Sequence, residues 1–351
     1  WRWMLGFEIP FALLWFILVS LVPESPRWLM SVGREDDARK AMANLVSADS
    51  IEQEIESIKS NINSEKGLSL KEQFAALFSP LARKALIIGL LFAAVQPATG
   101  INAIYTYAPM IFELMGSDSP LWQTIWLGVV SLVANVFAFF LVDRLGRRPV
   151  VVIGLLWCAL SLGLCAWGFN QATYSWDDES IEKISLKLGS KASGSIEVLQ
   201  QQKDVVYEDD LSFITAMKEK LGDDFVNDNR NQLLGKAANI NAGLILLGIL
   251  SFIASFQFSI GPVMWVVLSE IFSNKIRGLA IPAAQLVAAS VSTLVSLFFP
   301  WQISNTGLQS VFLVYCAPVV LGLIVFWSLL PETKNKSIEE IESMLTGNKP
   351  N

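Results

Sequence analysis

Runs of about 20 consecutive apolar residues constrain this chain more than any other feature of its sequence. A helix of about 20 apolar residues spans the hydrocarbon core of a bilayer and satisfies its own backbone hydrogen bonds there. Such runs occur at residues 4–22, 86–112, 121–142, 150–169, 237–268, 279–299 and 309–330. Together with a hydrophobic content of 53%, they predict an all-α polytopic membrane protein.

Composition excludes several kinds of chemistry. The chain has no histidine, which rules out histidine-based metal sites and proton relays within it. Cys158, Cys165 and Cys316 all lie inside apolar runs, where we expect small core residues rather than disulfides or metal ligands. The sequence contains no recognisable nucleophile–base pair, metal cluster or phosphate-binding loop. We therefore expect no catalytic residue, metal, cofactor or nucleic-acid partner.

The basic residues predict the orientation of the spans. Lysine and arginine gather in segments 23–84, 143–148, 272–278 and 331–351, whereas the short loops 113–120 and 300–308 carry none. By the positive-inside rule the basic segments are cytoplasmic, including the C-terminus. Residues 170–236 then lie outside, and their lysines are no objection because long loops translocate regardless of charge.

Two polar segments separate the spans. Ile51, Ile55, Ile58 and Ile62 recur at helical spacing, which predicts amphipathic helices of a cytoplasmic linker domain, with a solvated linker as the alternative. Segment 170–236 is acid-rich and long for a loop.

Within segment 170–236 we expect a helix at 211–221 and disorder over much of the rest. The segment would serve as a partner-docking lid or as a lineage-specific decoration. A capping box at Ser337–Glu340 predicts a last short amphipathic helix.

One stretch of the second span is unusually polar. On a helix its polar side chains fall within an arc of roughly 140°. Pro97, Gly100 and Pro109 should interrupt the helical hydrogen bonds, which is tolerated at membrane depth where the backbone lines a cavity. The stretch indicates either a binding face for a neutral, hydroxyl-rich solute or a packed helix with polar contacts. The polar residues are Gln96, Thr99, Asn102, Thr106 and Tyr107.

Five motifs, in order and correctly spaced over most of the chain, carry a resemblance to a known family. They are Pro23–Arg27, Gln96–Asn102, Asp143–Arg148, Gly261–Glu270 with Arg277–Gly278, and Pro331–Lys334. With these motifs the chain resembles the sugar porters of the major facilitator superfamily, and bacterial sugar–proton symporters are the nearest type.

The resemblance implies a major facilitator fold of which this chain holds seven of twelve transmembrane helices. These would be the last helix of the N-terminal bundle and the six-helix C-terminal bundle. Because the chain begins at Trp1, just before a span, we expect it to be part of a longer protein, with the rest of the N-terminal bundle missing. The implied segments are helix six at 1–22, the cytoplasmic linker at 23–83, helices seven to nine at 84–169, the extracytoplasmic insert at 170–236, helices ten to twelve at 237–330 and the cytoplasmic tail at 331–351.

The resemblance also implies a sugar site. Gln96, Asn102 and Trp265 would contact the sugar, with Phe256 and Gly261 near them. Amide side chains donate and accept at once, as paired hydroxyls require, and an indole offers a flat apolar face with one donor. Packing alone is the alternative for Trp265. The further expected site residues are Thr106, Tyr107 and Gln285.

Departures from the family pattern leave the sugar open between a hexose and a pentose. Pro97 replaces the second of two glutamines, and Thr106 replaces the first of two tyrosines. Ser131 stands where the family has asparagine, with Asn135 one turn on. Ala288 stands at a usually polar position, flanked by Gln285 and Ser292.

The resemblance gives the cytoplasmic charges a gating role. Three arginines of the 143–148 turn would meet Glu270 and other acids, latching the bundle ends when the carrier is open outward. A plain positive-inside anchor is the alternative. The expected network consists of Glu24, Arg27, Asp143, Arg144, Arg147, Arg148, Glu270, Arg277 and Glu332.

The function implied is transport of a monosaccharide across the cytoplasmic membrane by alternating access, coupled to protons. The proton-linked acid is expected in the missing helices, because Glu8 is the one acid inside a span of this chain. Facilitated diffusion, a non-transporting sugar sensor on the same scaffold and an inactive truncated half-carrier are the alternatives.

Overall fold

The computed structural model describes residues 2, 6–43, 46–47, 51–65, 70–117, 119–188, 193–336, 340–341 and 344. Two compact units divide the chain, Trp1–Gln73 and Phe74–Asn351. The capping box predicted at Ser337–Glu340 lies largely outside the described residues.

The first unit contains one apolar helix and a small helical core. Helix α2 (Glu8–Ser20) buries none of its residues. Helices α3 (Pro26–Ser31), α4 (Glu35–Met42) and α5 (Ile51–Glu65) pack around Leu29, Ala38 and Ile55. The helical spacing of the isoleucines is thereby confirmed for α5, and the solvated-linker alternative is wrong.

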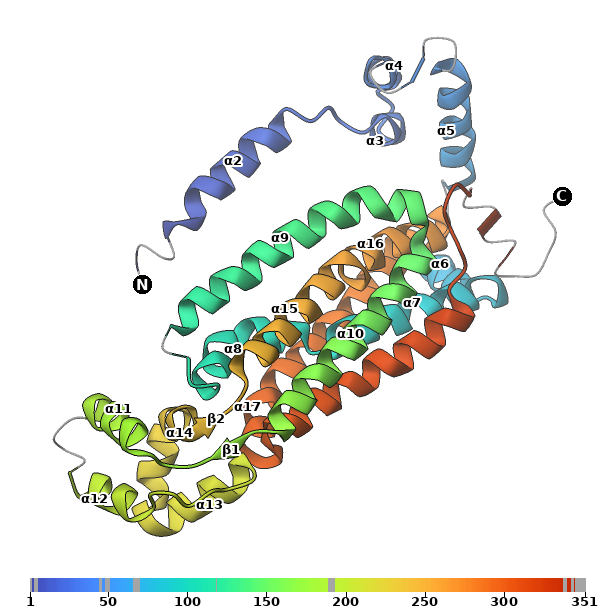
Figure 1. Cartoon of the computed structure of the whole chain (residues 1–351). Coiled ribbons are helices and arrows are strands. Elements are labelled where there is room, and N and C mark those ends of the chain that lie inside the picture. The colour runs from blue at the N-terminus through green and yellow to red at the C-terminus, as the bar shows by residue number, and fades with distance from the viewer. Residues whose placement is uncertain are drawn as a thin grey trace. The chain divides into compact units, whose positions relative to one another are not determined.

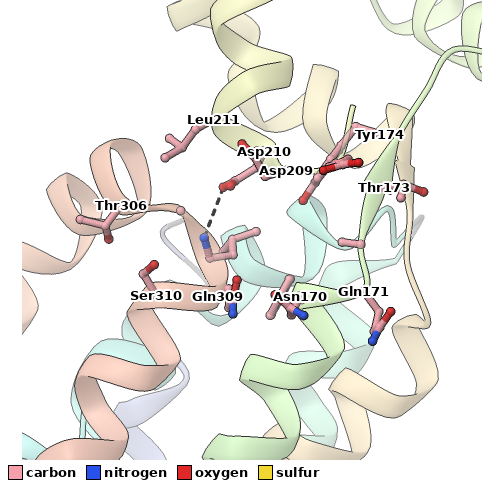
Figure 2. Close-up of a pocket in the computed structure, with 15 residues that line it drawn as sticks. Asn170, Gln171, Thr173, Tyr174, Asp209, Asp210, Leu211, Thr306, Gln309 and Ser310 are labelled. Atoms are coloured by element: carbon pink, nitrogen blue, oxygen red, sulfur yellow. Dashed lines mark hydrogen bonds between the residues drawn. The ribbon is translucent and has the colours of Figure 1, made fainter. Parts of the chain in front are cut away.

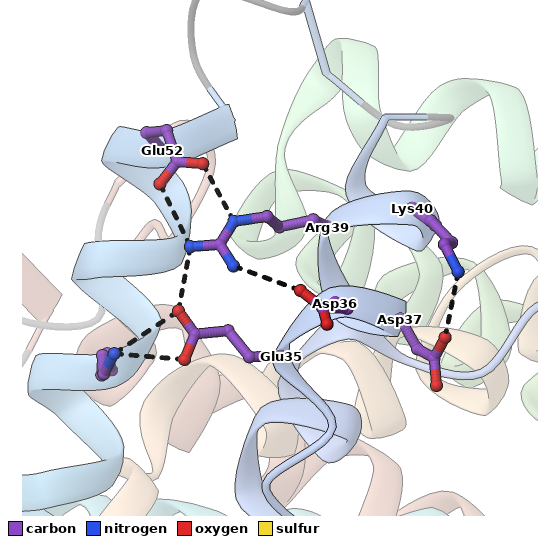
Figure 3. A network of polar contacts seen from close by, with 7 residues as sticks. Glu35, Asp36, Asp37, Arg39, Lys40 and Glu52 are labelled. Carbon is purple, nitrogen blue, oxygen red and sulfur yellow. Dashed lines mark hydrogen bonds and ion pairs between the residues drawn. The ribbon is translucent and has the colours of Figure 1, made fainter.

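A charge network joins α4 to α5 in this unit (Figure 3). Arg39 contacts Glu35 and Glu52 at 2.9 Å each, and Lys59 Nζ lies 3.2 Å from Glu35 Oε2. The hydrogen bond from Lys59, supported by its charge and that of Arg39, lowers the pKa of Glu35. These exposed pairs each contribute little stability, so the buried apolar contacts hold the helices together.

The second unit is a bundle of long apolar helices (Figure 1). Helix α6 (Leu70–Leu77) begins in the first unit and ends in the second. Helix α10 packs against α15 and α17, α7 packs against α17, and α9 packs against α15. The bundle helices are α7 (Pro80–Ala98), α8 (Ile101–Leu114), α9 (Pro120–Leu145), α10 (Arg147–Asn170), α15 (Ala242–Phe258), α16 (Ile260–Ile271) and α17 (Asn274–Leu329).

Five helices of the described chain are long and apolar enough to cross a membrane. They are Ala82–Leu114, Pro120–Leu145, Arg147–Asn170, Ala242–Ile271 and Ile276–Leu329, and the apolar helix Glu8–Ser20 is shorter.

The prediction of a loop at 300–308 is wrong for residues 300–306, because α17 continues through them. The backbone leaves helical geometry at Gly307, with φ 78° and ψ 161°. The orange and red halves of α17 run back along each other (Figure 1).

Segment 170–236 is folded, and the expectation of extensive disorder there is wrong. A two-residue antiparallel pair, β1 (Thr173–Tyr174) and β2 (Ala238–Asn239), closes its base. The helix predicted at 211–221 is confirmed as part of α13. The helices between the strands are α11 (Asp178–Leu188), α12 (Ser193–Gln201), α13 (Asp210–Leu221) and α14 (Asp223–Ala237).

The insert has a core of aromatic residues. The ring of Phe213 lies 5.6 Å from that of Tyr174, 5.8 Å from Trp176 and 5.5 Å from Tyr207, measured between centroids. Large aromatic side chains bury much surface per residue, so a few of them stabilise a segment that is polar on average.

The prediction that the cysteines are small core residues is confirmed for the two on α10. Cys158 and Cys165 are fully buried on α10, and Cys316 on α17 is half-buried. All of them are free thiols.

Candidate functional site

The predicted break in the second span lies at Gly100, between α7 and α8. Gly100 has φ 83°, a conformation that glycine adopts without a steric penalty. A methyl group there would lie 2.7 Å from Tyr315 Cγ, so the backbone and this ring of α17 are in close contact. Pro97 lies inside α7, and α8 continues through Pro109, where the expected interruption is absent.

Helix α8 is bound to α17 by polar contacts. Asn102 Nδ2 donates to Ser292 Oγ at 2.7 Å, and Tyr107 OH donates to the Ser296 carbonyl at 3.2 Å. The Tyr107 ring stacks on Phe299 with centroids 5.1 Å apart. Two of the polar residues expected on this stretch therefore also serve as packing contacts.

Two other polar residues of the stretch keep their hydrogen-bonding capacity. Gln96 is half-buried and Thr106 is exposed, and among the described residues neither side chain has a hydrogen-bond partner. Thr99 is fully buried, and its hydroxyl donates to the Gln96 carbonyl at 2.8 Å. The amide of Gln96 is thus free to bind a solute.

The second broken helix lies at Ser259, where α15 meets α16. A methyl group at Gly261 would lie 2.8 Å from Phe256 Cε1, so these two expected site residues are in contact. Phe256 is buried, whereas 45% of Trp265 is exposed. Helix α16 packs against α7 and α17. Gln285 of α17 is exposed.

Sequence reasoning did not assign Gln257 to the site. Its Nε2 donates to Ser131 Oγ at 2.9 Å and to Tyr105 OH at 3.3 Å, so it joins α15 to α8 and α9. Asn135, one turn after Ser131, donates its amide to the Ser131 carbonyl at 3.0 Å. An amide side chain inside an otherwise apolar run was the sequence feature that could have pointed to Gln257.

Among the charges predicted for gating, Arg147 is the one that meets Glu270. Arg147 Nη2 lies 3.0 Å from Glu270 Oε1, and Arg147 Nη1 lies 3.1 Å from Asp143 Oδ1. The other carboxylate oxygen of Glu270 accepts a hydrogen bond from Thr333 Oγ1 at 2.6 Å. This cluster joins α9, α10 and α16 to the segment after α17.

Glu332 binds backbone rather than an arginine side chain. Its Oε1 accepts from the Arg147 amide at 3.0 Å and its Oε2 from the Arg148 amide at 3.2 Å. The carboxylate thus caps α10, where backbone N–H groups lack helical partners and the dipole favours negative charge. Gly146, with φ 95°, allows this approach, because a methyl group there would lie 2.6 Å from Glu332 Oε2.

The remaining expected charges have other partners. Arg148 Nη2 donates to the Trp327 carbonyl at 2.6 Å, and Arg277 Nε donates to the Phe272 carbonyl at 3.2 Å. Arg144 is exposed, with no side-chain partner among the described residues. Of the three arginines predicted to meet Glu270 and other acids, Arg147 is brought to Glu270, whereas the side chains of Arg144 and Arg148 contact no acidic side chain among the described residues.

Two members of the expected network lie in the first unit. Glu24 Oε2 pairs with Arg34 Nη1 at 2.9 Å. The side chain of Arg27 is outside the described part of the chain.

Long apolar helices, two of them broken beside polar and aromatic side chains, define a polytopic membrane protein of the transporter type. A family model described as "Sugar (and other) transporter" matches residues 1–187 and 230–345. The chain belongs to this family, the sugar transporters of the major facilitator superfamily, and is not an enzyme. Residues 188–229, within the insert, lie outside the match.

Curated relatives include several proton symporters. The chain is 27% identical over 347 residues to the arabinose-proton symporter of Bacillus subtilis, covering 98% of this chain and 60% of the relative. It is 29% identical over 356 residues to the D-xylose-proton symporter of Escherichia coli K12, covering 98% and 57%. The chain thus spans about three-fifths of the length of these relatives.

A solved structure supports the fold. The proton:xylose symporter XylE bound to 6-bromo-6-deoxy-D-glucose matches with a TM-score of 0.67 at 27% identity, covering 98% of this chain and 59% of that chain. An inward-open structure of the xylose transporter XylE from E. coli matches with a TM-score of 0.57 at 26% identity. The fold is therefore of the major facilitator type.

Proposed function

We propose that this chain is the C-terminal part of a carrier that moves a monosaccharide across the cytoplasmic membrane by alternating access. It would hold seven of twelve transmembrane helices. In this proposal α2 is the last helix of the N-terminal bundle, and the two halves of α17 are separate crossings that meet at Gly307. The C-terminus would be cytoplasmic and the insert extracytoplasmic.

The observation that carries the proposal is the pair of broken helices with free polar and aromatic groups. The unpartnered amide of Gln96 and the exposed indole of Trp265 belong to α7 and α16, which pack against each other. Asn102 Nδ2 already donates to Ser292 Oγ, which leaves its carbonyl oxygen to accept from a sugar hydroxyl. The apolar face of Trp265 suits the C–H face of a pyranose ring.

The site is proposed as one half of a complete sugar site. Gln285, Thr106 and Trp265 are exposed, and a sugar held on them alone would stay largely hydrated. Small-ligand sites bury about 70–90% of their ligand. Helices supplied by a longer protein, as in the relatives, would complete the enclosure.

Proton coupling is proposed from the relatives, several of which are named as proton symporters. Glu8 is the acid inside the apolar helix α2. We place the coupling acid outside this chain, in the helices that would complete the N-terminal bundle.

The cytoplasmic charges are proposed to hold the ends of the C-terminal bundle together while it moves. The Arg147–Glu270–Thr333 cluster and the Glu332 cap tie α9, α10, α16 and the tail into one body. When two conformational states differ in free energy by a few kcal/mol, a small number of such ion pairs and hydrogen bonds can shift their populations.

Radiolabelled sugar uptake tests the proposal. The full-length gene would be expressed in cells lacking their own carriers for xylose, glucose, galactose and arabinose, and uptake measured with and without a protonophore. Uptake of one sugar that collapses with the protonophore supports proton symport. Uptake that persists down the gradient makes the protein a facilitator. No uptake of any of the four sugars contradicts the proposal and favours a sensor.

A further inference from the structure

A polar pocket of about 600 Å³ lies where the insert meets the bundle (Figure 2). It is formed by the end of α10, the strand β1, the start of α13 and the kink of α17. Its size is within the roughly 300–1,000 Å³ typical of small-ligand sites. The α13 side comes from residues outside the family match, so the insert creates the pocket.

The insert is fastened to the bundle at this pocket. Asp210 Oδ2 accepts a hydrogen bond from the Leu308 amide at 3.2 Å, just after the Gly307 kink. Arg230 Nη2 donates to the Ile303 carbonyl and its Nη1 to the Ser304 carbonyl, both at 3.3 Å. These contacts fix the pocket walls relative to each other, so a ligand would find them preorganised.

Several polar side chains of the lining are free to bind. Asn170 and Gln171 at the end of α10 are exposed, and Gln309 and Ser310 beyond the kink are half-buried. Among the described residues none of these side chains has a hydrogen-bond partner. Three amides and a hydroxyl from two separate segments thus converge on one space, and each amide both donates and accepts.

Tyr174 adds a further hydroxyl to the pocket lining. The residue as a whole is 2% exposed, and among the described residues its hydroxyl has no hydrogen-bond partner. The hydroxyl points into the pocket beside Asp209 and Asp210 (Figure 2). The hydroxyl is not among the fully enclosed polar atoms that lack a partner, so it is open to the pocket and can donate to or accept from a bound hydroxyl.

The charge of the lining selects the ligand class. Glu208, Asp209 and Asp210 line the pocket, and the described lining residues include no lysine or arginine, which disfavours anionic ligands such as sugar phosphates. The described chain also has no group of three histidine, cysteine, aspartate or glutamate side chains placed to hold a metal ion. Carboxylates accept hydrogen bonds from hydroxyls, so the lining suits a neutral, hydroxyl-rich molecule.

We propose that this pocket is a second carbohydrate site, separate from the proposed transport site around Gln96, Asn102 and Trp265, that binds a neutral sugar or polyol on the insert's side of the bundle. The ligand is either the transported sugar itself or another polyhydroxylated molecule. The proposal rests on the proposed function only in the choice of sugars as probes.

Saturation-transfer difference NMR on the purified full-length protein tests it, with D-xylose, D-galactose and myo-inositol as probes. The background variant Asn102→Ala/Trp265→Ala removes groups of the proposed transport site. We expect one probe to bind this background protein. Binding should weaken at least about tenfold with Asn170→Ala/Gln309→Ala added, and about three- to tenfold with Tyr174→Phe, the range for one lost hydrogen bond.

Matched controls lie in the same insert. Gln200 is exposed on α12, and Tyr207 packs on Phe213 with its hydroxyl on Gln202. Gln200→Ala and Tyr207→Phe should leave binding unchanged. Absence of probe binding to the background protein, binding indifferent to the pocket variants, or ⁴⁵Ca²⁺ binding that Glu208→Gln abolishes would each overturn the proposal. Loss of sugar uptake by the full-length protein bears on the transport proposal alone.

Discussion

Replacing Arg147 with methionine should destabilise the second unit through the acid it leaves behind. The Arg147 side chain is 13% exposed and that of Glu270 25% exposed. Removing the guanidinium leaves the Glu270 carboxylate with Thr333 Oγ1, at 2.6 Å, as its one remaining partner among the described residues. Methionine keeps the apolar volume, so the loss reports the charge contact.

The magnitude follows from the burial of the pair. Removing one partner of a fully buried ion pair costs about 3–5 kcal/mol. Because a quarter of Glu270 reaches solvent and Thr333 still donates to it, we expect about 2–3 kcal/mol. At about 2–4 °C per kcal/mol for a unit of this size, the unfolding midpoint falls by about 4–12 °C.

The double variant Arg147→Met/Glu270→Leu distinguishes charge from packing. Replacing both partners by apolar side chains leaves no buried unpaired charge, because Asp143, the other partner of Arg147, is 73% exposed. We therefore expect a loss of about 1 kcal/mol or less. Thermal unfolding in detergent, followed by tryptophan fluorescence, measures both. Arg144→Met, on the exposed neighbour, is the matched control and should change nothing. If the stability lost in the double variant equals the sum of the losses in Arg147→Met and Glu270→Leu, this reasoning is refuted.

Three further predictions concern single contacts. Gly146→Ala should lower the free energy of unfolding by about 1–3 kcal/mol, because the added methyl group meets the Glu332 carboxylate and the backbone has a φ of 95°. Gly163→Ala, with open space around the added methyl group, should not destabilise the protein. Equal shifts of the unfolding midpoint in the two variants would contradict this. Burial raises the pKa of Asp210 above its ordinary 3.8, so the folded state holds that proton more tightly and the contribution of Asp210 to stability, full below pH 3.8, is lost as pH rises through the folded-state pKa. Asp210→Asn should remove this fall in the unfolding midpoint as the pH rises above 3.8, and an unchanged pH dependence would show that Asp210 is not its source. Gln257→Leu removes the hydrogen bonds to the half-buried hydroxyls of Ser131 and Tyr105. It should lower the free energy of unfolding by about 1–3 kcal/mol, the net contribution of two hydrogen bonds; an unchanged free energy would mean that those hydroxyls find other partners.

Sequence periodicity located the apolar helices because burial in lipid demands long uniform runs. It placed the break at Gly100 correctly, since that residue has the positive φ typical of glycine. It missed the continuation of α17 through residues 300–306. The predicted span ended at residue 299, just before Pro300, whereas proline is tolerated within a transmembrane helix.

The insert shows how average composition misleads. Its acidic residues suggested disorder, but Tyr174, Trp176 and Phe213 are buried together. Phe213 lies far from Tyr174 and Trp176 in the sequence, so no local pattern predicts the core that they form together.

The sequence also could not predict which distant residues contact each other. The residue types on α8 indicated a polar face, but that Asn102 donates to Ser292, 190 residues away, follows only from the packing of α8 on α17. Likewise Glu332 was expected among the arginines as an ionic partner. Its role as a cap on two backbone amides of α10 depends on where the tail passes the helix end.

The central claim is that sugar is recognised by the polar and aromatic groups of α7, α8, α16 and α17, with Gln96, Asn102 and Trp265 among them. The most direct test is equilibrium binding of the sugar identified by the uptake assay to purified full-length protein. Trp167, exposed on α10, provides the matched tryptophan control. The account predicts that Asn102→Ala and Trp265→Ala each weaken binding at least about tenfold, while Trp167→Ala leaves it unchanged. Near-normal binding in both Asn102→Ala and Trp265→Ala would contradict the claim.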